Sequence, residues 1–142
     1  MHKLIREIRT FYNSLVMLGE EIHSGESVTL GMRAVMEALL EEGPRTVPQI
    51  ARDRRVSRQR IQVMVNHLLE QDLVTHRSNP ANRRSHLIVL TRSGAAAIKR
   101  MRDREAERFA SLPQNVDVKR LVEQLAKLRE SLEQTQLRAT KP

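Results

Sequence analysis

The chain has 142 residues, the usual size of one domain, and carries 25 Lys and Arg against 17 Asp and Glu. The resulting net charge of +8 favours polyanionic partners. Hydrophobic residues make up 39%, and no run reaches the roughly 18 apolar residues of a membrane-spanning helix, so we expect a soluble protein without a membrane partner. The charged start of the sequence and the lack of cysteine predict a cytoplasmic location and exclude disulfides and thiolate metal sites.

The positive charge is concentrated in the middle of the sequence. Residues 1–50 carry five basic and seven acidic side chains, residues 51–104 carry thirteen and four, and residues 105–142 carry seven and six. A charge excess confined to one segment indicates a local binding surface rather than a uniformly solvated coat.

Both ends of the sequence carry apolar residues at alternating spacings of three and four, which predicts one amphipathic helix at each end. The first helix should end near His23–Gly25, and the second should follow a break at Leu112–Pro113 with Asn115 as N-cap. Two such seams flanking a polar middle predict a homodimer, with dimerisation helices in residues 1–24 and 112–137 and a frayed tail at 138–142. The dimerisation residues are Leu4, Ile8, Phe11, Leu15, Val118, Leu121, Leu125, Leu128 and Leu132.

Three shorter helices are predicted between residues 28 and 72. An apolar stripe over 28–40 ends at Gly43–Pro44, and we assign its Met32 and Met36 to the core rather than to a ligand pocket. Thr46 and Gln49 have the spacing of a capping box, so they open a second helix with Val47, Ile50 and Ala51 inward, followed by a turn over 52–56. Ser57 caps a third helix that ends near Gln71–Asp72; its buried side is Ile61, either Met64 or Val65, Leu68 and Leu69.

The apolar period changes to two after residue 72. Residues 73–77 and 86–91 read as two strands joined by a basic loop over 78–85, and a connecting helix follows over 91–111. His76 and His86 lie on the two strands, either facing each other or simply exposed. The predicted fold is therefore mainly α with a small β-hairpin (α+β).

The sequence offers little for catalysis. The five glycines are scattered, so the glycine-rich phosphate and dinucleotide fingerprints are missing, and the five histidines lack the spacing of a helical metal pair. We therefore expect no enzyme activity, no catalytic residues, no cofactor and no metal site.

The order helix, turn, helix and basic hairpin predicts binding to double-stranded DNA. A recognition helix fills the major groove and reads base edges from its N-terminal, solvent-facing side. Arg, Gln and Asn are the residue types that make bidentate contacts to guanine and adenine, and no acid occurs from Ser57 to Leu69. The predicted recognition residues are Ser57, Arg58, Gln59, Arg60, Gln62 and Asn66; wing contacts come from Asn82, Arg83 and Arg84, and weaker phosphate contacts from Arg52, Arg54 and Arg55. The 2% aromatic content disfavours RNA and single-stranded partners, which need stacking platforms.

Several segments together resemble the MarR-type winged-helix transcriptional regulators. They are Gly43–Pro44, Val47–Ala51, Val56–Gln59, Leu68–Glu70, Leu73–Val74, Asn79–Pro80 with Arg83–Arg84, and Leu90–Thr91 with Gly94. The resemblance covers essentially the whole chain and implies a winged helix-turn-helix at 28–92 and an obligate homodimer on a pseudo-palindromic operator. It also implies a repressor that small phenolic or other lipophilic ligands release, held between the dimerisation helices and the winged domain; the sequence does not define the pocket residues.

Four positions depart from the pattern of that family. Asp72 stands where a glycine usually ends the recognition helix, and Asn82 stands where an Asp usually orients the wing Arg, so Arg84 is held by a neutral hydrogen bond or points freely at phosphate. Val63 replaces a common Arg, and Arg60 replaces a small hydroxyl residue, which predicts an altered base preference.

Two other functions remain open at this point. One is a DNA-binding dimer without a small-molecule input, acting constitutively or architecturally. The other is a protein-interaction module in which the terminal seams bind a different partner.

Overall fold

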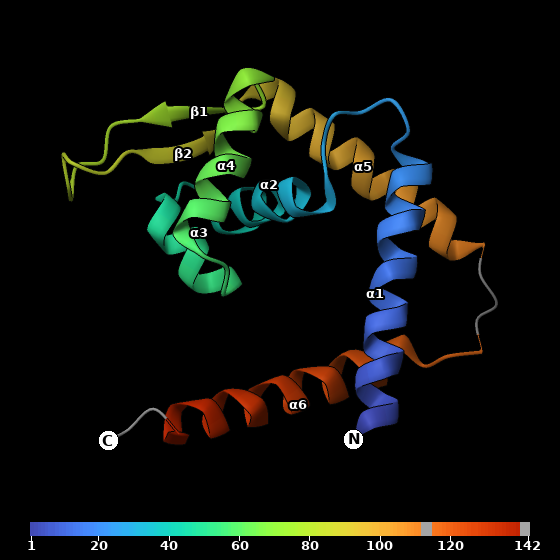
Figure 1. Cartoon of the computed structure of the whole chain (residues 1–142). Helices are drawn as coiled ribbons and strands as arrows, with labels where there is room; N and C mark the ends of the chain where they lie inside the picture. Colours follow the sequence, from blue (N-terminus) through green and yellow to red (C-terminus); the bar gives the residue numbers. More distant parts are fainter. Residues whose placement is uncertain (112–114, 140–142) are drawn as a thin grey trace. The chain divides into compact units, whose positions relative to one another are not determined.

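The computed structural model describes residues 1–111 and 115–139 and divides the chain into two compact units, residues 1–107 and 108–142 (Figure 1). Its elements confirm the predicted class, mainly α with one β-hairpin. In chain order they are α1 (His2–Ile22), α2 (Leu30–Glu42), α3 (Val47–Arg54), α4 (Arg58–Glu70), β1 (Val74–Arg77), β2 (Leu87–Leu90), α5 (Arg92–Ala110) and α6 (Val118–Ala139). None of the described helices is long and apolar enough to cross a membrane.

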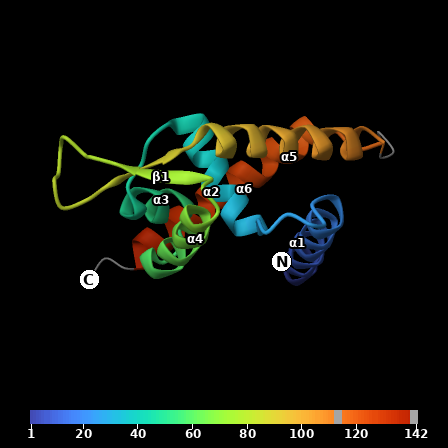
Figure 2. The same ribbon diagram turned by 90° about the horizontal axis from the view of Figure 1, so that it is seen from above.

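Strands β1 and β2 form an antiparallel hairpin that extends away from the helices (Figures 1 and 2). The register pairs Val74 with Leu90 and Arg77 with Leu87. Arg45 forms an isolated antiparallel β-bridge with Ile88 of β2. Its amide donates to the Ile88 carbonyl (3.2 Å), and its carbonyl accepts from the Ile88 amide (2.7 Å). The hairpin is thus tied to the segment that enters α3.

The core of the first unit lies where α2, α3, α4, the base of the hairpin and α5 meet. Its buried residues are Met32, Val35, Met36, Leu39, Ile50, Ala51, Ile61, Val65, Leu68, Val74, Ile88, Ala97, Ile98 and Met101. Met32 and Met36 are therefore core residues, as predicted. Val28 and Leu40 are only partly buried, and Val28 precedes α2, whose N-cap is Thr29.

The start of α5 packs closely against the backbone of Asp72 and Leu73, just before β1. Thr91 caps α5, because its hydroxyl accepts from the Gly94 amide (2.9 Å), and the same hydroxyl donates to the Asp72 carbonyl (2.6 Å). A Cβ placed on Gly94 would overlap the Leu73 carbonyl oxygen. Position 94 therefore requires glycine so that the helix can approach the backbone at this distance.

The second unit contains α6, whose predicted start is wrong by two residues. The Asp117 carboxylate accepts from the Arg120 amide (3.0 Å), so Asp117 and not Asn115 caps the helix. A carboxylate at this place also interacts favourably with the positive end of the helix dipole. The helix continues through Ala139, past the start of the predicted frayed tail; residues 140–142 of that tail and the predicted break at Leu112–Pro113 lie outside the described residues.

Candidate nucleic-acid interface

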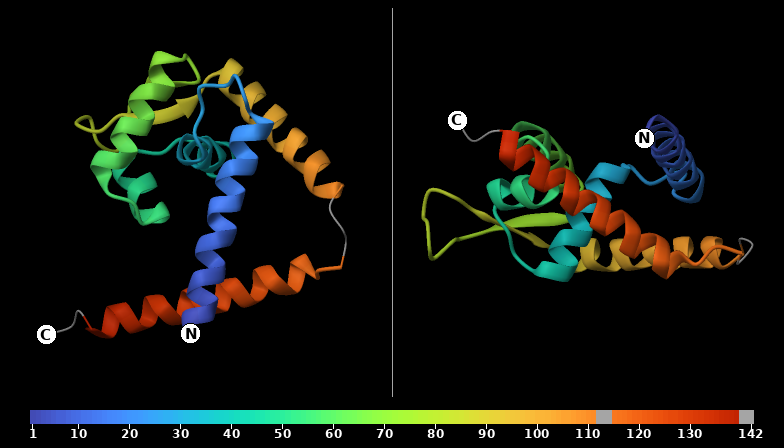
Figure 3. Two further views of the ribbon diagram at one scale, coloured as in Figure 1. Left: turned by 45° about the vertical axis from the view of Figure 1, so that its right-hand side comes forward. Right: turned by 90° about the horizontal axis from the view of Figure 1, so that it is seen from below.

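The helix-turn-helix is formed by α3 and α4. The predicted capping box opens α3: the Thr46 hydroxyl accepts from the Gln49 amide (3.4 Å), and the Gln49 side chain accepts from the Thr46 amide (2.8 Å). The predicted turn over 52–56 is too long, because α3 continues to Arg54 and ends at Arg55 in the left-handed conformation (φ 54°). The connection between the two helices is therefore very short (Figure 3), which fixes the direction of α4.

Helix α4 begins and ends as the sequence indicates. The Ser57 hydroxyl accepts from the Arg60 amide (3.3 Å), and Gln71 is the C-cap. Asp72 adopts the left-handed conformation (φ 54°) in which a helix commonly ends. Of the two alternatives for the inner face, Val65 is fully buried, whereas Met64 is half-buried at the edge of the core.

All six predicted recognition residues are exposed on α4, but they occupy different parts of its surface. Arg58 and Gln62 lie on one flank, Gln59 and Asn66 in the middle, and Arg60 on the other flank beside Met64. The Gln62 amide nitrogen donates to the Asn66 side-chain oxygen (2.8 Å), so these two amides form one fixed unit. The sequence analysis did not include Val63 in the site, yet it is 50% exposed in the middle of this face. Helical spacing from the buried Ile61 and Val65 could have found it.

The wing tip is ordered by two asparagines. The Asn79 side-chain oxygen accepts from the Ala81 amide (3.1 Å), and that of Asn82 accepts from the Arg84 amide (3.0 Å). Asn82 therefore holds the backbone of Arg84, whereas the expected hydrogen bond was to the Arg84 side chain. Both Arg83 and Arg84 are exposed at the tip.

The histidines at the stem of the wing satisfy both predicted alternatives. His76 and His86 are exposed, and their ring centroids lie 5.4 Å apart. The contact places two titratable rings side by side below the wing tip.

The predicted phosphate-contacting residues lie at the end of α3. Arg52 and Arg54 belong to its last turn, Arg55 is its C-cap, and all three are exposed. The neighbouring Asp53 carboxylate forms an ion pair with Arg45 (3.0 Å). This pairing leaves the end of α3 strongly positive next to the start of α4.

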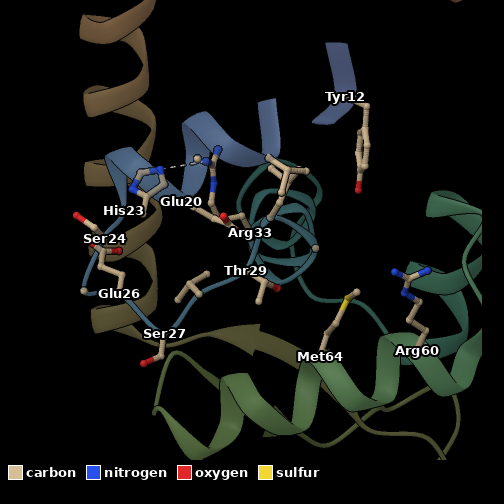
Figure 4. Close-up of a pocket in the computed structure, with 16 residues that line it drawn as sticks. Tyr12, Glu20, His23, Ser24, Glu26, Ser27, Thr29, Arg33, Arg60 and Met64 are labelled. Carbon is tan, nitrogen blue, oxygen red and sulfur yellow. Dashed lines mark hydrogen bonds between the residues drawn. The ribbon is translucent and has the colours of Figure 1, made fainter. Parts of the chain in front are cut away.

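A cavity of about 630 Å³ lies within the first unit, between α1, the segment that leads into α2, and α4 (Figure 4). Its wall is partly apolar, with Val16, Val28, Leu30 and Met64. Polar side chains also line it, among them Tyr12, Arg33 and Arg60 with donor groups and the acidic Glu20 and Glu26. Neither the cavity nor its lining was predictable from the helical periods, because α1 and α4 are remote in sequence.

A buried ion-pair network forms one side of this cavity. Arg33 is 5% exposed and makes a two-pronged contact with Glu105, in which one guanidinium nitrogen lies 2.6 Å from Oε2, and it also contacts Glu37 (3.2 Å). His23 is buried beside them, with Nε2 3.1 Å from an Arg33 nitrogen. The sequence analysis missed this network.

Burial lowers the pKa of His23, and the positive charge of Arg33 lowers it further. Among the described residues, His23 Nδ1 and Arg33 Nε are buried without a hydrogen-bond partner. A neutral ring can accept from Arg33 at Nε2, which fits the lowered pKa.

The predicted dimerisation residues occupy open faces. Within α1, which is described throughout, Leu4, Ile8 and Phe11 are exposed and Leu15 is half-buried. In α6, Val118, Leu121, Leu125 and Leu132 are exposed and Leu128 is half-buried. Each terminal helix thus presents an uncovered apolar face.

Residues 33–85 match the sequence model of the MarR family. The winged helix of this chain is therefore similar to that of the MarR family. A MarR family transcription regulator of known structure is 27% identical, with a TM-score of 0.74, and the match covers 97% of this chain and 89% of that one. No curated protein sequence matches the chain.

More distant structures confirm the fold. The transcriptional regulator BldR from Sulfolobus solfataricus gives a TM-score of 0.80 at 18% identity, with 91% of this chain and 94% of BldR covered. Reduced AbfR, a Staphylococcus epidermidis protein solved bound to DNA, gives 0.75 at 20% identity, with 92% of each chain covered. The family and its structural neighbours are transcription regulators, which are not enzymes.

Proposed function

We propose that this chain is a sequence-specific regulator of transcription that binds double-stranded DNA. The observation that carries the proposal is the exposed face of α4, which is rich in Arg, Gln and Asn and free of acids from Ser57 to Leu69. The net charge of residues 51–104 and the DNA-bound structure of the similar AbfR support it. A helix of this composition suits the major groove, where these side chains pair with base edges.

The candidate residues take different roles in this proposal. Base edges are read by Arg58, Gln59, Arg60, Gln62 and Asn66, of which Arg60 lies on the flank beside Met64. The Ser57 end of the helix holds a phosphate through its backbone amides. Wing residues Asn82, Arg83 and Arg84 reach the adjacent minor groove or its phosphates, and Arg52, Arg54 and Arg55 contact the DNA backbone.

We further propose that the active form is a homodimer. The open apolar faces of α1 and α6 support association with a second copy, because burying them stabilises the assembly. A two-fold dimer would present two α4 helices to major grooves about 34–36 Å apart, and its operator would be pseudo-palindromic.

Repression relieved by a small lipophilic or aromatic ligand completes the proposal. The cavity supports it: apolar walls suit a hydrophobic body, and the Tyr12 hydroxyl and the Arg60 guanidinium suit an anionic end (Figure 4). Since Arg60 and Met64 belong to α4, an occupant of the cavity would contact the recognition helix itself. It would release DNA only by favouring a conformation that the operator cannot match.

Fluorescence anisotropy with a duplex from the upstream region of the gene and a scrambled duplex tests the proposal. We expect a preference of about 10³ or more for the upstream duplex, and release on adding an aromatic acid such as salicylate. The Arg58→Ala variant should lose about 1–3 kcal/mol of binding free energy and some sequence preference. Arg84→Ala should weaken binding to both duplexes and lower the salt slope by about 1 per protomer.

Lys119→Ala is the matched control, since it removes one exposed positive charge from α6. It should leave both the affinity and the salt slope almost unchanged. Equal losses from Arg84→Ala and Lys119→Ala would contradict the role of the wing. Binding to neither duplex would mean that the operator does not lie upstream of the chain's own gene. Failure to select any duplex from a random pool would contradict DNA recognition altogether.

A further inference from the structure

Val63 is an apolar side chain in the middle of a polar surface. It is 50% exposed, and within α4, all of which is described, it is the one exposed large hydrophobic residue. Gln59 precedes it by four residues and Asn66 follows it by three, so all three lie on the same side of the helix. The surface that faces outward most directly therefore consists of two amides with an isopropyl group between them.

The amide next to Val63 is held in one orientation. Because the Gln62 nitrogen donates to the Asn66 oxygen (2.8 Å), the pair presents the Gln62 oxygen as an acceptor and the Asn66 nitrogen as a donor. An acceptor beside a donor matches the major-groove edge of adenine, which offers an N6 donor and an N7 acceptor. Guanine offers two acceptors there, so it leaves the Gln62 oxygen without a donor.

The valine side chain has its own partner in the major groove. Thymine is the base that presents a methyl group there, and an apolar side chain in contact with it removes both groups from water. Valine has one strongly preferred χ1 rotamer in a helix, so it loses little rotamer freedom when it makes this contact.

We infer that the middle of α4 reads a short A·T step, with a thymine C5 methyl against Val63 and an adenine edge on the Gln62–Asn66 amide pair. The inference rests on the proposed DNA-binding function and adds to it the base composition at the centre of each half-site. It identifies Val63 as a specificity-determining residue.

Replacing thymine by deoxyuridine tests the inference, because the change removes the methyl group and leaves base pairing intact. A duplex selected from a random pool by the full-length protein serves as the operator. Each thymine is then replaced, at both symmetry-related positions, and anisotropy gives Kd for the wild type, Val63→Ala and the control Val116→Ala. Val116 is also an exposed valine, at 56%, but it lies outside α4.

We expect one thymine position at which deoxyuridine weakens wild-type binding about fourfold per half-site, the size expected for one buried methyl group. Val63→Ala should bind the thymine operator more weakly by a similar factor and show no further loss with deoxyuridine, whereas Val116→Ala should behave like the wild type.

The inference is overturned if deoxyuridine is tolerated at every position. It is also overturned if the loss is the same in the wild type and in Val63→Ala, because another residue would then contact the methyl. If the selection enriches no duplex, the proposed function fails, which distinguishes that failure from the failure of the Val63 contact.

Discussion

The winged helix and the terminal helices share one kind of sequence pattern, an apolar stripe at helical spacing, but the two sets of stripes differ in burial. In α2 and α4 the stripe is buried by the chain itself, with Met36, Val65 and Leu68 fully enclosed. In α1 and α6 the stripe is largely exposed, and the described side chains of these two helices include no buried residue.

An apolar stripe in the sequence therefore predicts an amphipathic helix, but it does not identify the surface that packs against the stripe. The seams of α2 and α4 find partners within about 75 residues of the same chain, in the helices and the hairpin that surround them. In α1, by contrast, large apolar side chains stay exposed, with Phe11 at 55% and Ile8 at 44%. The apolar stripes of the winged helix are therefore covered within one chain, whereas those of α1 and α6 are left largely uncovered.

Ile8→Asp should have the largest effect, because it breaks the terminal-helix side of this comparison. Ile8 is 44% exposed, so burying the rest of it contributes roughly half of the 1.5–3 kcal/mol of a whole isoleucine; a symmetric dimer loses this twice, about 1.5–3 kcal/mol in all, and burying the two new carboxylates adds to the loss. Analytical ultracentrifugation should show monomers at concentrations where the wild type is dimeric. Met17→Asp, which also adds a charge to α1 but outside the seam, should remain dimeric; a dimeric Ile8→Asp would contradict the assignment of this face.

Gly94→Ala tests the other half of the comparison, because it should disrupt the packing within the winged helix. The added methyl overlaps the Leu73 carbonyl, so α5 has to move off the backbone, and we expect a loss of about 3 kcal/mol in the free energy of unfolding. Urea denaturation at fixed protein concentration measures it.

Gly19→Ala is the matched control, because a Cβ at that position of α1 meets no described atom within 4 Å. It should raise helix stability by up to about 1 kcal/mol. Similar losses from both variants would mean that the close approach at Gly94 does not limit packing.

The smallest expected effect is the pH dependence of folding stability that His23 causes. His23 follows α1 directly and contacts Arg33 of α2, so it tests the place where α1 meets the winged helix. Burial and Arg33 lower the folded-state pKa of His23 below its ordinary 6.5, while Glu26 opposes and Arg104 adds to the shift. The unfolded chain therefore takes up the proton first as pH falls. His23 favours the folded state above about pH 6.5 and loses this contribution as pH falls below that value.

Thermal unfolding from about pH 8 to pH 5 checks the sign. The midpoint of the wild type should fall more steeply below pH 6.5 than that of His23→Gln, while His67→Gln, at an exposed position on α4, should follow the wild type. A steeper fall in His23→Gln would contradict the lowered pKa.

Local backbone chemistry was the part of the fold that could be predicted best. Thr46, Ser57 and Gly43 act within four residues of their own positions, so their effect on helix ends is visible in a short stretch of sequence. Asp72 is another example, since it adopts the left-handed conformation that the position requires. Asn115 failed as a cap because the nearby Asp117 offers a charged acceptor one residue before the helix.

Features that depend on distant partners could not be predicted. Arg33 lies on the buried side of α2 because Glu105, 72 residues later, meets its guanidinium there, and no helical period encodes that partner. The lining of the cavity has the same origin, since it comes from separate helices; the family resemblance implied only its place between α1 and the winged helix. Within the candidate interface, the polar residues were visible because their type signals their chemistry. Val63 was noted only as a departure from the family pattern, and its place on the outer face of α4 is evident from its exposure.

The two asparagine turns of the wing have a thermodynamic consequence for any association through its tip. Fixing the backbone of one residue costs about 1–2 kcal/mol of conformational entropy, and the backbone amides that donate to the Asn79 and Asn82 side chains already hold this loop in the free protein. On contact, Arg83 and Arg84 then lose mainly the rotamer freedom of their side chains. A wing without these asparagines would have to order its backbone at the same moment, so its association would show a larger unfavourable entropy for the same set of contacts.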